Sequence, residues 1–94
     1  MKRRKFASVW DTLEDNAGDA ANMRARSELM IALRNKIEGW KINQTAAATR
    51  LGLTQPRLND LMRGRIDKFS LDGLVTLAAA AGLSVTVKVS KRAA

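Results

Sequence analysis

A glycine between two short runs of helical spacing constrains the fold of this chain more than any other feature. The stretch is LGLTQPRLNDLMRG, residues 51–64. Gly52 can adopt the left-handed conformation that ends a helix. Thr54 can start the next helix by accepting a hydrogen bond from one of its first amides, and Pro56 falls in the first turn, where it removes no helical hydrogen bond. The pattern predicts two short helices, over 44–51 and 55–63, joined by a tight turn.

Apolar spacing predicts a long helix before this pair. Met30, Leu33 and Ile37 recur at intervals of three and four residues, so a helix is expected over 20–38. Gly39 is expected to end it. The preceding residues 6–13 are short and mixed, which suggests a strand or an irregular segment, and a polar linker is expected between them and the helix.

Two further polar residues stand where a helix should begin. Asn43 is expected to cap the helix over 44–51, and Ser70 is expected to cap a fourth helix over 71–81. Apolar residues of this last helix are expected in the core; they are Leu74, Val75 and Leu77.

The last part of the chain alternates β-branched and polar residues. Its sequence over 84–90 is SVTVKVS, a pattern typical of a β-strand. A single strand cannot satisfy its own backbone groups, so it needs either the segment around 7–12 or the same strand of a second chain. The predicted dimer contacts are Val85, Val87 and Val89.

Composition narrows the possible functions. The chain has 94 residues, enough for one domain with a modest core, and it contains neither cysteine nor histidine. Disulfides, thiolate metal sites and the commonest general base are therefore missing. No acidic pair has a suggestive spacing either, so we expect no enzyme activity, no cofactor and no metal site. Without a membrane-length apolar run or a signal peptide, a cytoplasmic protein is expected.

The positive charge is distributed unevenly. The net charge is +8 and the isoelectric point is about 10.9, which favours nucleic-acid phosphates or anionic lipid as partners. Residues 6–20 carry four acidic side chains and no basic one, whereas residues 41–68 carry six basic and two acidic ones. A charge run is often only a solvated face. Here the basic run coincides with the predicted helix pair, which favours a nucleic-acid surface.

Two short helices joined by a glycine turn are the minimal helix-turn-helix. A first helix braces a second, which enters the DNA major groove, about 12 Å wide. Gln55 could read adenine, and Arg57 could pair with guanine or a phosphate, while Asp60 could orient an arginine or accept from cytosine. The predicted DNA-binding residues are Gln44, Thr54, Gln55, Arg57, Asn59, Asp60, Arg63, Arg65 and Lys68.

The stretch QTAAATRLGLTQPRLNDLMRGRIDKFSLDGLVTLAAAAGLSVTV resembles the Xre/Cro-type helix-turn-helix regulators. The residues that carry the resemblance are Gln44, Ala48, Gly52, Leu53, Thr54, Gln55, Leu58 and Gly64. The flanking segments VWDTL, RSELMIALRNKI and GLSVTVKV resemble the HigA-like antitoxin branch. The resemblance implies a mainly α, lambda-repressor-like bundle of four to five helices with a short C-terminal β-strand.

The same resemblance implies a function. Members of this branch form homodimers on a palindromic operator, repress their own operon at the nucleoid and often neutralise a RelE-like ribonuclease toxin. A stand-alone Xre-family repressor without a toxin is the alternative. The acidic residues of 11–19 could cover a basic ribonuclease groove, or could simply balance the basic tail. An RNA-binding protein is less favoured, because the few aromatic residues do not alternate with basic ones.

The chain is expected to divide into three parts. Residues 1–19 form a basic tail and an acidic segment, residues 20–82 form the helix-turn-helix DNA-binding domain, and residues 83–94 form the C-terminal strand and a basic tail.

Overall fold

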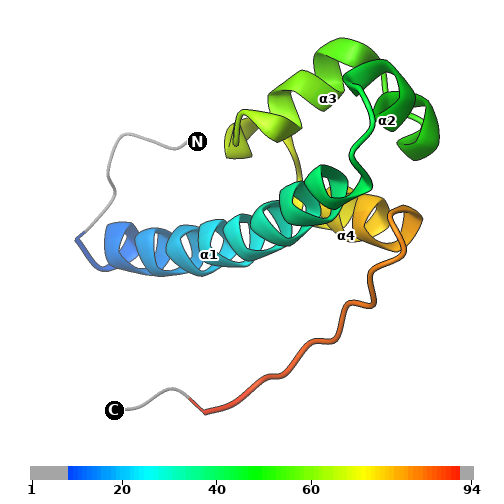
Figure 1. The fold of residues 1–94 in the computed structure, drawn as a ribbon. Helices are drawn as coiled ribbons and strands as arrows, with labels where there is room; N and C mark the ends of the chain where they lie inside the picture. Colours follow the sequence, from blue (N-terminus) through cyan, green and yellow to red (C-terminus); the bar gives the residue numbers. More distant parts are fainter. Residues whose placement is uncertain (1–8, 92–94) are drawn as a thin grey trace.

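The computed structural model describes the backbone of residues 9–91 and the side chains of residues 17–91. Within this part the chain forms four α-helices and one short 3₁₀ turn, shown in Figure 1. The elements are α1 (Val9–Trp40), α2 (Gln44–Leu51), α3 (Gln55–Met62), η1 (Ile66–Lys68) and α4 (Leu71–Ala80). None of the helices in this part of the chain is long and apolar enough to cross a membrane.

The core is built from residues of α1, α2, α3 and α4. The predicted stripe of α1 is buried, with Leu33 fully inaccessible, and it belongs to one cluster with Leu58 and Leu61 of α3 and Leu74 of α4. The helical spacing of the sequence therefore located most of the core correctly. Val75 differs from the expectation, because it lies beside the buried stripe of α4 and is 36% exposed.

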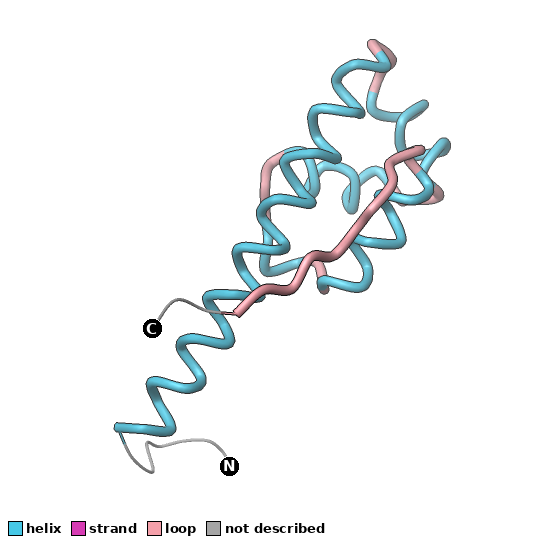
Figure 2. Tube along the Cα trace, turned by 90° about the horizontal axis from the view of Figure 1, so that it is seen from below, coloured by secondary structure: helices cyan, strands magenta, loops and turns pink. Residues whose placement is uncertain are grey.

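Helix α1 is longer than predicted. The region expected to be a polar linker is helical, and α1 already begins at Val9. Its alanine and glutamate residues are good helix formers, and the cost of Gly18, about 1 kcal/mol in a helix interior, is too small to break it. Figures 1 and 2 both show the N-terminal part of α1 projecting beyond the bundle. Residues 6–8 lie outside the described part.

The end of α1 also differs from the prediction. Gly39 lies inside the last turn, and the helix continues to Trp40. The left-handed residue that ends it is Lys41, with φ 56°. A lysine in this conformation is uncommon, which is why the sequence pointed to the nearby glycine instead.

The predicted caps of the other helices are confirmed. The side chain of Asn43 accepts a hydrogen bond from the Ala46 amide at 2.8 Å, and Ser70 Oγ accepts one from the Gly73 amide at 3.1 Å. The Ser70 hydroxyl also lowers the pKa of the neighbouring Asp72 carboxyl below its ordinary value, because a hydrogen bond to the charged form favours it.

The predicted C-terminal strand is not formed. Residues 83–91 are extended, but no β-ladder is present among residues 9–91, and Figure 2 draws this segment as loop. The physical reason is the absence of a partner, since residues 9–12 of the proposed intrachain strand belong to α1. Val85 packs against the core, whereas Val87 and Val89 are 83% and 87% exposed.

Candidate nucleic-acid interface

The turn between α2 and α3 fixes the angle between them. Gly52 ends α2 in the left-handed conformation with φ 71°, as predicted, and the Leu53 amide donates to the Ala48 carbonyl at 2.8 Å. Thr54 then caps α3 by accepting a hydrogen bond from the Arg57 amide at 3.3 Å. Ala47 and Ala48 are buried, and their small side chains let a neighbouring element approach α2 closely.

Helix α3 has one buried side, an outer side opposite to it, and two flanks between them. Successive side chains turn by about 100° around a helix, so the buried Leu58 and Leu61 leave Pro56 and Arg63 on the opposite, outer side. Asn59 is half-buried beside this outer side. One flank of α3 then faces α2, and the other faces η1.

The flank toward α2 is held by an amide. Gln55 Nε2 donates to Thr45 Oγ1, so the side chain at the start of α3 is tied to the first turn of α2. Gln44, the first residue of α2, directly precedes Thr45 in the sequence, and its side chain is exposed. Both glutamines therefore belong to the end of the helix pair where α2 and α3 begin.

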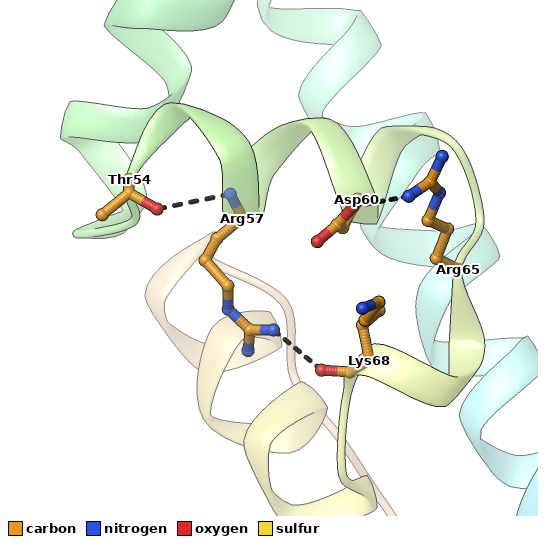
Figure 3. Close-up of polar contacts among 5 residues, drawn as sticks. All are labelled: Thr54, Arg57, Asp60, Arg65 and Lys68. Carbon is orange, nitrogen blue, oxygen red and sulfur yellow. Dashed lines mark hydrogen bonds and ion pairs between the residues drawn. The ribbon is translucent and has the colours of Figure 1, made fainter.

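The flank toward η1 is a charged cluster, drawn in Figure 3. Arg57 Nη1 donates to the Lys68 carbonyl at 2.7 Å, and its guanidinium lies over the Phe69 ring at 4.2 Å from the centroid. Asp60 and Arg65 form an ion pair at 3.4 Å. In Figure 3 the side chain of Lys68 points toward α3, so three cations and one carboxylate share this surface.

Comparisons with known proteins agree with this geometry. A family model described as a helix-turn-helix domain matches residues 12–90. No curated protein sequence matches significantly. A solved structure described as a "Putative XRE Family Transcriptional Regulator" matches with a TM-score of 0.72 at 32% sequence identity, covering 79% of this chain and 83% of that chain. The chain belongs to the XRE family of helix-turn-helix regulators.

DNA-binding regulation of transcription fits this XRE-family chain and its surface. The residues predicted to bind DNA fall into separate groups around α3. Arg57, Asp60, Arg65 and Lys68 come together on one flank. Gln44 and Gln55 lie at the other, Arg63 is exposed at the end of the helix, and Thr54 serves as the cap. Their contacts with DNA remain a prediction.

An arginine of α1 that the sequence did not single out supports the interface of this XRE-family chain. Arg26 Nη1 donates to the carbonyls of Ile66 and Phe69, at 3.1 and 3.2 Å, and Arg26 Nε donates to Asn22 Oδ1 at 2.6 Å. No local signal distinguishes Arg26 from the exposed Arg24, because its acceptors lie 40 and 43 residues away.

Thr45 and Arg50 also acquire roles that the sequence did not reveal. Thr45 holds Gln55, and the only hint was its position in the first turn of the helix that precedes α3. The guanidinium carbon of Arg50 lies over the Trp40 ring, 3.9 Å from its centroid. This cation–π contact joins the end of α2 to the end of α1.

Replacing Arg26 by alanine should lower the free energy of unfolding by about 2 kcal/mol, because two main-chain acceptors lose a charged donor. Urea denaturation followed by circular dichroism measures the change. Arg24→Ala is the matched control, since it removes the same side chain from an exposed position and should change the stability by less than about 0.5 kcal/mol. Equal midpoints for the two variants would contradict the supporting role of Arg26.

Proposed function

We propose that the protein is a sequence-specific DNA-binding repressor that acts at the nucleoid in the cytoplasm. The observation that carries the proposal is the setting of α3. Its leucines are buried beneath it, α2 braces one flank through Thr45 and Gln55, and basic side chains gather on the other flank. A helix presented in this way can enter a major groove with phosphate contacts on both sides.

The groups around α3 suggest different tasks. Gln55 and Asn59 carry amides that can donate to and accept from adenine. Arg63, Arg65 and Lys68 are exposed cations suited to phosphates. Gln44 and the capped start of α2 suit a further phosphate contact, and Asp60 orients Arg65 through their ion pair.

Selection from a random-sequence duplex library tests this function. The wild-type chain should enrich one motif and should bind it at least about 10³-fold more tightly than a scrambled duplex. Gln55→Ala and Asn59→Ala should each reduce that preference by about tenfold or more, since a bidentate base contact contributes about 1–3 kcal/mol of discrimination. Asn35→Ala, which removes an equal amide from an exposed position of α1, is the control. Failure to enrich any motif would refute sequence-specific binding.

The repressor is proposed to bind a palindromic operator as a homodimer, with residues 84–90 of two copies pairing as antiparallel strands. The exposed Val87 and Val89 support this, as does the extended backbone of the segment. Antiparallel pairing with Val87 opposite itself places Val85 opposite Val89 and Lys88 opposite Thr86. In this register the two Lys88 side chains are not opposite each other, so the unfavourable pairing of like charges is avoided.

Val87→Asp should therefore convert the dimer to a monomer, because two carboxylates would meet at the centre of the paired strands. Sedimentation equilibrium measures the mass. Thr86→Asp is the matched control on the same strand, and it should leave the dimer intact because it places a carboxylate opposite Lys88. A wild-type monomer at high concentration, or a dimer that tolerates Val87→Asp, would exclude these strands as the contact.

The repressor is further proposed to be the antitoxin of a type II toxin–antitoxin pair. Support comes from α1, whose N-terminal part projects beyond the bundle and carries Asp11, Glu14, Asp15 and Asp19 in its sequence. Such an acidic arm suits the basic groove of a RelE-like ribonuclease.

Co-expression with the product of the neighbouring reading frame tests the antitoxin role. The wild-type chain should restore growth, and a variant with these four acids changed to their amides should not. If the neighbouring product is harmless when expressed alone, the chain is a stand-alone repressor.

A further inference from the structure

Side chains from two helices donate hydrogen bonds to the main chain of the segment between α3 and α4. We call residues 65–69 the basic loop, since they include Arg65 and Lys68. From α1, Arg26 donates to the carbonyls of Ile66 and Phe69. From α3, Arg57 donates to the carbonyl of Lys68 at 2.7 Å. The main chain of the basic loop is thus fixed by side chains of two different helices.

Arg57 makes two contacts with the basic loop at once. Its guanidinium carbon lies over the ring of Phe69, 4.2 Å from the centroid, while its Nη1 donates to the Lys68 carbonyl. Phe69 is 3% exposed, so the ring is itself part of the core. To read a base edge in the major groove, Arg57 would have to give up both contacts.

Only a guanidinium suits this arrangement. Its plane stacks on an aromatic face while its N–H groups project sideways toward an acceptor. A lysine ammonium has no such plane, so it can lie over the ring or reach the carbonyl but does not combine the two in the same way. The contact is therefore specific for arginine and not merely for positive charge.

We propose that Arg57 is a positioning residue, which holds Lys68 and the basic loop against the DNA backbone instead of reading a base. The proposal rests on the proposed DNA-binding function. The Lys68 carbonyl is drawn toward α3 by Arg57, and in Figure 3 the Lys68 side chain points toward the same helix. The ammonium of Lys68 is thereby placed beside α3, where a phosphate that flanks the major groove would lie.

Four variants test the proposal: Arg57→Ala, Arg57→Lys, Lys68→Ala and the double variant Arg57→Ala, Lys68→Ala. Binding is measured by fluorescence anisotropy on the duplex enriched by the wild-type chain and on a scrambled duplex of the same composition. Circular dichroism confirms that each variant is folded.

Arg57→Ala and Arg57→Lys should each weaken binding to both duplexes by about tenfold, which leaves the sequence preference unchanged, as loss of a backbone contact does. In the Lys68→Ala background the further loss from Arg57→Ala should be less than about twofold, because coupled residues are not additive. A reduced preference for the enriched duplex would make Arg57 a base reader. Full rescue by lysine, or additive losses, would make it an independent charge contact. Any of these three results overturns the proposal.

A measurement without DNA gives a second readout. In the free protein, Arg57→Lys should shift the backbone amide resonances of Lys68 and Phe69 while leaving that of Thr45 in place. Unchanged resonances at the basic loop would contradict the positioning role. If the wild-type chain binds neither duplex, both the proposed function and this inference fail. If the wild-type chain binds sequence-specifically and the Arg57 variants bind both duplexes as tightly as the wild type, only this inference fails.

Discussion

Replacing Leu58 by alanine should lower the free energy of unfolding by about 2–5 kcal/mol, the range found for large-to-small changes in a core. Leu58 is a fully buried residue by which α3 enters the hydrophobic core. A domain of this size is stabilised by only about 5–15 kcal/mol in total. The variant should therefore unfold in part under mild conditions, and its DNA binding should fall with the folded fraction.

Ile31→Ala is the matched control for Leu58→Ala. It removes the same number of carbon atoms, but Ile31 is 56% exposed on α1, so the expected change is below about 0.5 kcal/mol. Urea denaturation of both variants gives the comparison. Similar losses at the two positions would mean that α3 is not held by the core in the way described.

Raising the salt concentration from 50 to 200 mM should weaken operator binding by about 10³-fold, the loss expected when about six phosphates are contacted. The count follows from three exposed cations near α3 in each of two copies; these are Arg63, Arg65 and Lys68. The slope of log affinity against log salt concentration should be close to −5, from about −0.9 per phosphate. Anisotropy titrations at four or more salt concentrations measure it.

Two variants test whether the slope of log affinity against log salt concentration comes from phosphate contacts around α3. Arg63→Ala should make it shallower by about 1.8 in a dimer, since one phosphate contact is lost from each copy. Lys36→Ala removes an equal charge near Gly82, at the end of α4, and should leave the slope unchanged. A slope that responds equally to both substitutions would indicate diffuse attraction and not defined contacts around α3.

The helix pair could be predicted from the sequence because its determinants are local. Gly52 ends α2 and Thr54 begins α3 through contacts with residues no more than four positions away. The C-terminal strand could not be settled in the same way, because a strand depends on a partner elsewhere in the chain or in another chain. The extended but unladdered backbone around Val87 shows the limit of an alternating pattern.

The candidate site was predictable in composition but not in arrangement. The sequence identified Gln55, Arg57 and Asp60 as polar residues of the second helix. Their contacts with Thr45, Lys68 and Arg65 required the tertiary structure. The pairing of Asp60 with an arginine had been one of two open interpretations. The long reach of Arg26 to residues 66 and 69 had no counterpart in any local pattern.

The hydrogen bonds that Arg26 and Arg57 donate to the basic loop have a consequence for evolution and engineering. Arg26 and Arg57 bind main-chain oxygen atoms, and every residue type supplies such an oxygen. The side chains at positions 65, 67 and 68 can therefore change without loosening the loop, provided that the Phe69 ring is kept. Residues that meet the DNA backbone could be exchanged there to adjust affinity while the course of the loop stays the same.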